Sequence, residues 1–274
     1  MARLKKLVTN APGKTINELR IILALERAVH RLERHPRLSD HLIFKGGFVL
    51  LKTIGTHRFT RDLDALAFEI SKEEVPSLVI EALTVDLGDG LWFGDILTQD
   101  LMDQGKYGGL RFNCAYQIGE PPLQKEKIKK LSRIHIDIGF GDEMDSPPQR
   151  KAMNSILIEI QPVSWLVYSL ETIFSEKLET LISRGSLNSR AKDLYDLVVI
   201  FDKYKDNLEL GPSIELTFRN RNTPLPKSFF EAASKFDLEM LKTSWSSVLL
   251  TETSKSFDEV WILVLQIFRE LDAK

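Results

Sequence analysis

Two acidic residues, two positions apart, carry the strongest chemical signal in the sequence. Asp62 and Asp64 lie in the run 62–70, which has the length and apolar content of a β-strand. Alternate residues of a strand point to the same face, so the two carboxylates would lie about 6 to 7 Å apart on one side. Carboxylate oxygens suit Mg²⁺, which keeps waters and substrate phosphates as its other ligands. The pair therefore favours metal-dependent phosphoryl or nucleotidyl transfer.

A third acid is expected from a neighbouring strand. Asp137 is a polar residue in the run 134–140, where isoleucines at positions 134, 136 and 138 alternate with other residues. We expect Asp137 to complete the metal site and to help deprotonate the acceptor, and His135 shares its face.

A glycine pair precedes these acids. Gly46 and Gly47 follow Lys45 and separate the short apolar run 42–44 from the apolar run 48–54, which predicts a turn into a helix. Glycine allows a close approach of the backbone, and the N-terminus of a helix attracts anions, so this place suits a triphosphate. A single Asp-x-Asp or Gly-Gly motif is more often structural, but their combination in this order favours a functional site.

The remaining patterns predict the elements that position these residues. We expect a helix over 15–32, a helix over 79–87 and strands over 91–97 and 110–117, with loops at the proline pairs 121–122 and 147–148. After Pro162 the patterns become helical, over 163–184, 191–204, 228–248 and 256–271. The sequence thus predicts an α+β N-terminal domain over 1–160 and a mostly helical domain over 161–274.

Composition restricts the class of protein. The chain has 274 residues, 43% of them hydrophobic and 28% charged, which indicates a folded globular protein of one or two domains. Lys plus Arg (37) nearly balance Asp plus Glu (39), so any polyanion site must be a local patch. Cys114 is the single cysteine, which excludes an intramolecular disulfide and Cys-rich zinc motifs. No apolar run reaches the length of a signal peptide core or a membrane span, so we expect a soluble, cytoplasmic protein without membrane contact.

The order of the motifs resembles a known superfamily. A glycine pair that opens a helix, an Asp-x-Asp strand and a later single acid are similar to polymerase-β-type nucleotidyltransferases. More narrowly, Lys-Gly-Gly followed by Arg-Phe-Thr-Arg-Asp-Leu-Asp at 58–64 resembles the AbiEii/AbiGii-type (MenT-like) nucleotidyltransferase toxins. A second block looks like the helical motif of that family, with Glu171, Glu176, Lys177, Arg184 and the run 190–196. The resemblance spans about residues 40 to 200, and the stretch 71–130 shows no family signature.

The resemblance implies a fold and an activity. The fold would be a polymerase-β-like mixed sheet with flanking helices, and the helical domain would complete the active-site cleft. The enzyme would transfer NMP from an NTP, with Mg²⁺ and release of pyrophosphate, most simply to the 3′ end of tRNA, and an antitoxin would be its partner. The implied metal ligands are Asp62, Asp64 and Asp137. Lys177 would join them as a catalytic residue, and the implied nucleotide-binding residues are Lys45, Gly46, Gly47, Arg58, Thr60, Arg184, Lys192 and Asp193.

The second block also has a purely structural interpretation. Lys177 and Arg184 interrupt an apolar helical stripe, so each cation must reach solvent, pair with an acid or meet an anionic ligand. Asp193 borders the apolar face of its helix and also suits the helix N-terminus, whereas we expect Asp196 to project more toward solvent. Arg58 either binds phosphate or braces the loop before the strand.

Other interpretations of the whole protein stay open at this point. The acceptor can be a protein or a small molecule instead of tRNA, or the fold can serve as a non-catalytic nucleotide-binding module. Two basic clusters are solvated surface by default and would contact the backbone of an RNA acceptor. The first comprises Lys125, Lys127, Lys129, Lys130 and Arg133, and the second comprises Arg219, Arg221 and Lys227. The tryptophans and phenylalanines of the C-terminal part, Trp165 among them, are expected in the core of helical elements.

Overall fold

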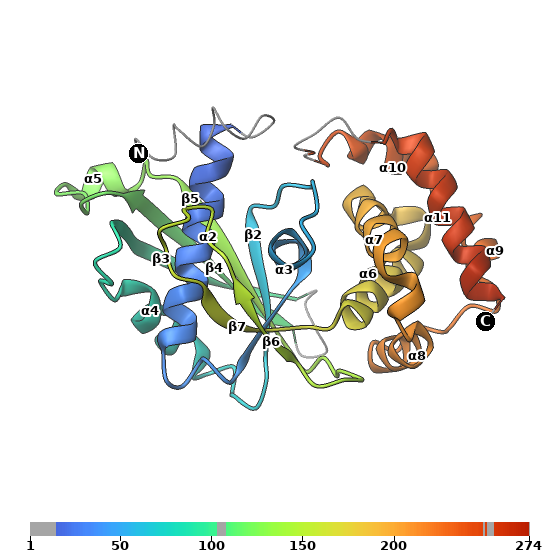
Figure 1. Cartoon of the computed structure of the whole chain (residues 1–274), viewed down its shortest axis with the longest axis horizontal. Coiled ribbons are helices and arrows are strands. Elements are labelled where there is room, and N and C mark those ends of the chain that lie inside the picture. The colour runs from blue at the N-terminus through green and yellow to red at the C-terminus, as the bar shows by residue number, and fades with distance from the viewer. Residues whose placement is uncertain (1–14, 103–107, 249, 251–254, 274) are drawn as a thin grey trace. The chain divides into compact units, whose positions relative to one another are not determined.

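The computed structural model describes residues 15–102, 108–248, 250 and 255–273. The expected absence of a signal peptide concerns residues 1–14 and lies outside this part of the chain. The chain forms two compact units (Figure 1). The described residues of the first unit are 15–55, 60–102, 108–141 and 148–167, and those of the second are 56–59, 142–147, 168–248, 250 and 255–273. The second unit thus takes two short segments from within the range expected for the first domain.

Among the described residues, the first unit is built on a mixed sheet of seven strands in the order β3-β4-β5-β2-β1-β7-β6. The central strand β2 pairs in parallel with β5 and antiparallel with β1, and β4 pairs antiparallel with both β5 and β3. The strands are β1 (Leu42–Lys45), β2 (Asp62–Ala67), β3 (Leu91–Leu101), β4 (Gly109–Ile118), β5 (Arg133–Phe140), β6 (Gln149–Met153) and β7 (Val163–Val167).

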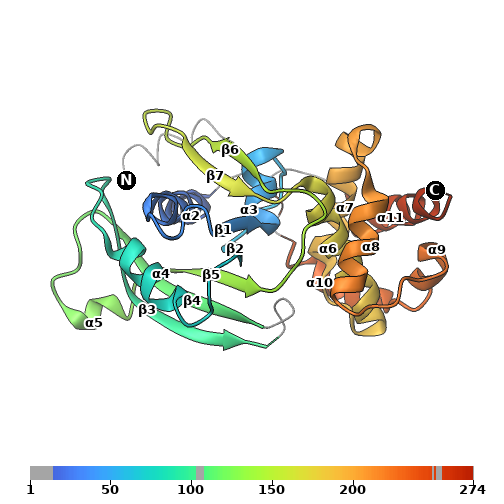
Figure 2. The same ribbon diagram turned by 90° about the horizontal axis from the view of Figure 1, so that it is seen from below.

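The described helices of the first unit flank this sheet or lie in the connections between its strands. They are α2 (Ile16–Arg34), α3 (Gly46–Thr53), α4 (Val75–Thr84) and the short α5 (Lys125–Ile128). Helix α2 begins with a capping box in which Thr15 and Glu18 satisfy each other's backbone N–H groups, and it packs against α4, β5 and β7 (Figure 2). Helix α3 follows β1 without a loop and packs against β1, β2 and β6. Helix α3 therefore packs directly on β2, the strand that carries Asp62 and Asp64.

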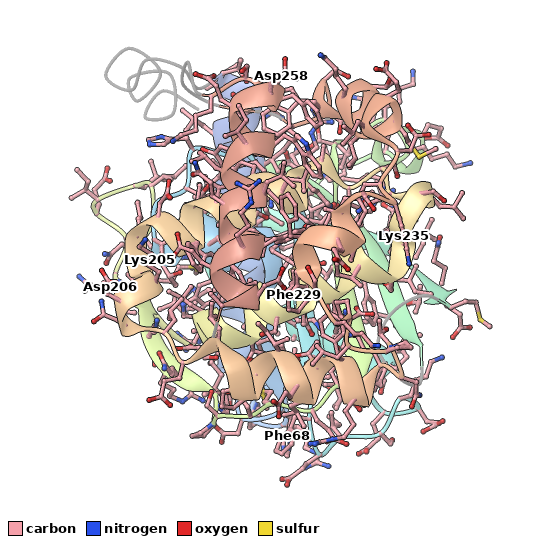
Figure 3. All side chains as sticks on the ribbon, turned by 90° about the vertical axis from the view of Figure 1, so that its right-hand side faces the viewer. Phe68, Lys205, Asp206, Phe229, Lys235 and Asp258 are labelled. Atoms are coloured by element: carbon pink, nitrogen blue, oxygen red, sulfur yellow. The ribbon has the colours of Figure 1, made fainter. Side chains whose placement is uncertain are left out.

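The second unit is helical. Its α-helices are α6 (Leu170–Arg184), α7 (Ala191–Tyr204), α8 (Leu210–Asn220), α9 (Phe229–Ala233), α10 (Leu238–Trp245) and α11 (Phe257–Asp272). Phe229, labelled in Figure 3, packs against Phe218 of α8 and Phe268 of α11, and such aromatic contacts form the core between the helices. None of the described helices of either unit has the length and apolarity to span a membrane.

Three of the expected helices are wrong in extent, and the helix expected over 79–87 is α4, which begins earlier at Val75 with Pro76 in its first turn. The run 163–184 contains the strand β7 before α6, because Ser169 caps the helix only at Leu170 and the preceding residues pair with β1 and β6. Trp165 is accordingly a buried strand residue in contact with Phe44 and Phe48. The run 228–248 is divided into α9 and α10, because Asp237 caps a new helix start. Strand β6 and helix α8 were not expected.

Candidate active site

Four charged side chains form a row across four neighbouring strands of the first unit. Lys45 of β1 lies opposite Asp64 of β2, and Asp64 lies beside Asp137 of β5. Asp137 in turn lies opposite Arg111 of β4. Paired residues of adjacent strands point to the same face, so the row has two neighbouring negative charges with a positive charge at each end. We call these four residues the charged row.

Asp62, a predicted site residue, and His135 lie on the same face, two positions back along the strands. Asp62 of β2 pairs in register with His135 of β5, and the His135 Nδ1 lies 3.2 Å from the Asp62 Oδ1. Both side chains are partly exposed. The hydroxyl of Thr60 donates to the backbone oxygen of Asp62 at 3.4 Å, and this hydrogen bond links the loop before β2 to the first residue of the strand. The structure therefore brings Asp62, Asp64 and Asp137 to one face, as the alternation of the strands predicts.

Gly46 is required by this arrangement. Its φ of +74° is in the left-handed region, and an added Cβ would overlap the carboxylate of Asp64 and lie 3.0 Å from its Cγ. The backbone of the turn thus lies directly against Asp64. Helix α3 begins here, and Lys45, which precedes it, has no side-chain oxygen to cap the N–H groups of the first turn. The close approach expected from the glycine pair is present at Gly46, while Gly47 is buried.

Asp137 is held by an arginine that the sequence reasoning missed. Arg111 donates from Nε and Nη2 to the two carboxylate oxygens at 2.7 and 2.6 Å. The Asp137 side chain is only 4% exposed, whereas the Arg111 side chain is 32% exposed. The hydrogen bond to Asp137 raises the pKa of Arg111, against the opposing effect of burial, and the charges of Asp62 and Asp64 act in the same direction. The polar positions of the alternating run 110–117 were the signal that could have indicated Arg111.

These side chains fit a divalent cation in part. Among the described residues, no group of three or more His, Cys, Asp or Glu side chains is arranged to hold a metal ion. Asp62 and Asp64 are half-buried, share one face and offer the hard oxygen ligands that a cation such as Mg²⁺ takes. Asp137, expected as the third ligand, is covered by Arg111 instead. The residues present therefore fit a site with two carboxylates and do not form one with three.

In the second unit, charged residues of the second block form a buried ion-pair cluster. The Lys177 ammonium lies 2.7 Å from a carboxylate oxygen of Asp193 and 2.7 Å from one of Asp196. Arg58 donates from Nε and Nη2 to the two oxygens of Asp196, both at 2.8 Å, and Arg190 contacts Asp193. Burial lowers the pKa of Lys177, but the two aspartates outweigh it and raise the value, while their own pKa values are lowered by these cations.

This cluster corrects one expectation and shows structural partners for Lys177 and Arg58. Asp196 is fully buried and does not project toward solvent, because Arg58 from the loop before β2 and Lys177 both meet it. Lys177 pairs with acids, as the structural interpretation of its place on an apolar stripe allows. Arg58 braces its loop against α7. By contrast, Arg184 and Lys192 are exposed.

One expected basic cluster is not a surface patch. Arg221 is largely buried, with Nη2 2.9 Å from Glu176 and Nη1 3.0 Å from Glu179, and Asp142 lies 3.6 Å away. Arg219 and Lys227 are exposed. The expectation that Arg221 is a solvated residue is wrong, since three acids of the same unit surround it. In the other cluster Arg133 pairs with Asp95, and the side chain of Lys125 lies outside the described part.

Comparison with known proteins agrees with this fold and this motif order. The family model "Nucleotidyl transferase AbiEii toxin, Type IV TA system" matches residues 30–261. The solved structure of the nucleotidyltransferase toxin MenT4 from Mycobacterium tuberculosis is similar, with a TM-score of 0.57 and 17% identity over 98% of this chain and 97% of that one. JHP933 from Helicobacter pylori is similar with a TM-score of 0.53 and 18% identity over 91% of each chain. Among curated proteins no match is found.

The mixed sheet has the fold of the matched nucleotidyltransferase structures, and the family model shows that the chain is a nucleotidyltransferase. The chain belongs to the AbiEii family of nucleotidyltransferase toxins, which are the toxins of type IV toxin–antitoxin systems. An NTP substrate and an antitoxin partner follow from membership of this family.

Proposed function

We propose that this protein is a Mg²⁺-dependent toxin that transfers a nucleoside monophosphate from an NTP to the 3′ end of tRNA. The observation that carries the proposal is the charged row, with Asp62 beside it and the turn at Gly46 against Asp64. Acidic oxygens, cationic side chains and the backbone N–H groups at the start of α3 thus belong to one region of the sheet. Such a set suits a triphosphate with its divalent cation.

The roles of the residues follow from their positions. Asp62 and Asp64 would hold Mg²⁺, which when bound supplies positive charge against the phosphates. Lys45 and the first-turn N–H groups of α3, at Gly46 and Gly47, would bind the triphosphate. Thr60 supports β2 through the backbone of Asp62. These groups act mainly by positioning the substrate and by stabilising the charge that develops in the transition state.

The reaction is a single displacement. The oxygen of the acceptor hydroxyl forms a bond to the α-phosphorus, and the bond from that phosphorus to the oxygen bridging to the β-phosphate breaks. The electron pair of the broken bond leaves with pyrophosphate, and the hydroxyl proton passes to water. The charges held by Lys45, Arg111 and the helix terminus favour departure of the anionic pyrophosphate.

The residues of the second block remain predicted nucleotide-binding residues. Lys177, Arg58 and Asp193 have ion-pair partners within their own unit, so a role in binding phosphate would come in addition to this structural one. Arg184 and Lys192 are exposed cations that we propose to contact the nucleotide or the acceptor.

The choice of tRNA as acceptor rests on the family resemblance and on exposed lysines of the first unit. Lys127, Lys129 and Lys130 are all exposed around the end of α5. Such a local patch suits an RNA backbone, although the net charge of the whole chain is −2.

The test is transfer of label from each α-³²P-labelled NTP, with Mg²⁺, to total tRNA and to total cytosolic protein. We expect label in tRNA that is absent with Asp64→Ala, whose folding is checked by its melting curve. Label in protein would show that the acceptor is a protein and not tRNA. No transfer by folded protein that still binds NTP would exclude both of these acceptors and leave a small-molecule acceptor or a binding module.

A further inference from the structure

We propose that Arg111 stands in the place of a second divalent cation, so that the centre holds one metal ion, at Asp62 and Asp64, instead of two. This inference rests on the proposed function, because it concerns the metal centre of nucleotidyl transfer. A pair of ions about 3.5 to 4 Å apart is the usual device for such displacements and needs an acid that serves the second ion. Asp137 is the acid whose position suits that task, and it is already engaged.

The geometry of the pair makes Asp137 a poor ligand for a metal ion. Each of its two carboxylate oxygens accepts one hydrogen bond from Arg111, at 2.7 and 2.6 Å. This is the bidentate fork, the arrangement in which arginine and carboxylate hold each other most specifically. With 4% of its side chain exposed, Asp137 has almost no surface left for a hydrated cation to approach. Asp62, in contrast, has 38% of its side chain exposed.

The pair is also built into the sheet. Arg111 and Asp137 are direct partners in the antiparallel ladder of β4 and β5, so the fork does not depend on a loop. A direct cross-strand pair places its Cβ atoms about 4.5 to 5.5 Å apart, which lets the side chains meet without a change of backbone. The guanidinium therefore has a fixed position on the face that carries the predicted metal ligands.

The positive charge of Arg111 is suited to take the place of a second metal ion. Burial disfavours the guanidinium charge, yet Asp137, Asp62 and Asp64 together raise the pKa of Arg111 above its ordinary value. An arginine stays charged at every physiological pH, so this positive charge is present whether or not metal is abundant. Arg111 is thus a positioning residue that fixes Asp137 and supplies to the row the charge that a second ion would otherwise bring.

The experiment counts Mn²⁺ by electron paramagnetic resonance. The full chain is saturated with an NTP analogue that has a methylene group between the α- and β-phosphates, and Mn²⁺ is titrated in. We expect one Mn²⁺ per ternary complex, with the six-line spectrum of an isolated ion. Two ions per complex, or a spectrum broadened by coupling between neighbouring ions, would overturn the inference while leaving the proposed function intact.

Four variants sharpen the result. Asp137→Asn should still bind one Mn²⁺ per complex, because Asp137 is not a ligand, and loss of this Mn²⁺ at saturating concentration would overturn the inference. Arg111→Gln should expose Asp137 and admit a second Mn²⁺, which the double variant Arg111→Gln/Asp137→Asn should lose again. Asp64→Asn should weaken the first Mn²⁺. If it does not, the metal site of the proposed function fails, and the inference fails with it.

Discussion

Lys177 neutralises two carboxylates that have no access to water. Asp193 and Asp196 are both 0% exposed, and each oxygen that is paired with Lys177 lies 2.7 Å from its ammonium. A buried charge that loses its partner pays the desolvation cost without the compensating attraction. At the scale of single residues, the fold of the second unit therefore depends on this cation whether or not it also meets a nucleotide.

Replacement of Lys177 tests this role. Lys177→Met should lower the free energy of unfolding by about 3 to 5 kcal/mol, because two carboxylates remain buried with fewer cations. Arg184→Met is the matched control, since it removes an exposed cation from the same helix and should change stability by less than about 0.5 kcal/mol. Denaturant unfolding measures both. Equal stability of the two variants would show that the buried cluster does not need Lys177.

The close approach at Gly46 gives a second prediction at this scale. Gly46→Ala and Gly55→Ala should each cost about 1 to 2 kcal/mol of stability, because both glycines have positive φ. An added Cβ would overlap the Asp64 carboxylate at Gly46, whereas nothing lies within 4 Å of one at Gly55. Gly46→Ala alone should therefore reduce label transfer, by about a hundredfold. The same rate for both variants would mean that the turn does not position Asp64.

At the scale of elements, a buried ion-pair network ties α2 to the loop before β3. Asp89 lies in that loop and accepts hydrogen bonds from Arg27 at 2.8 Å and from Arg31 at 2.7 and 3.0 Å. Burial by itself would raise the pKa of Asp89, but the two arginines outweigh it and lower the value from 3.8 to about 2. The network is independent of the acidic strands and links the longest helix of the first unit to an edge strand.

This network predicts part of the acid sensitivity of the protein. The pKa of Asp89 is lower in the folded state, so its contribution is full above about pH 4 and is lost as the pH falls toward 2. Asp89→Asn should cost about 2 kcal/mol at pH 7 and flatten the loss of stability between pH 4 and 2. Asp86→Asn, at an exposed residue of the same loop, should keep the dependence of the unaltered protein. Unfolding curves at several pH values decide between these outcomes.

The sequence predicted the elements whose ends carry clear signals. Helix α7 begins and ends at the residues expected, and α11 is shifted by one residue, because Ser256 is an unambiguous N-cap. Strand β7 was assigned to a helix, since Val163–Val167 has five residues and runs directly into the periodic pattern of α6. Its identity as a strand depends on pairing with β1, far away in the sequence, which local patterns do not contain.

The candidate site, like the fold, could be predicted from the sequence only in part. Side-chain alternation along β2 and β5 was enough to place Asp62, Asp64 and Asp137 on one face. The partner of Asp137 was not predictable, because the antiparallel register of β4 against β5 decides that Arg111 and no other polar residue of the run meets it. The burial of Asp196 likewise depends on Arg58, which is 138 residues away along the chain.

At the scale of the whole molecule, binding of RNA must rest on a local patch, since the net charge is −2. If tRNA is the acceptor, changing Lys127, Lys129 and Lys130 to Gln should raise the KM for tRNA and weaken its salt dependence, with kcat unchanged. Each lost phosphate contact should reduce the slope of log affinity against log salt by about 0.7 to 0.9.

The control for this patch carries the same change of charge in the second unit. Lys235, Lys242 and Lys255, all exposed, are changed to Gln together. This variant should keep the KM and salt dependence of the unaltered protein. An equal rise in KM for both triple variants would indicate a general effect of net charge and remove the argument for a local patch.

The central claim is that the acidic face of the first unit performs nucleotidyl transfer. The most direct measurement is the initial rate of pyrophosphate release with NTP, Mg²⁺ and the identified acceptor, for the unaltered protein, Asp64→Asn and Asp86→Asn. We predict that Asp64→Asn lowers the rate by about a thousandfold with an unchanged melting temperature, and that Asp86→Asn keeps the full rate. A folded Asp64→Asn variant that releases pyrophosphate at the rate of the unaltered protein would contradict the account.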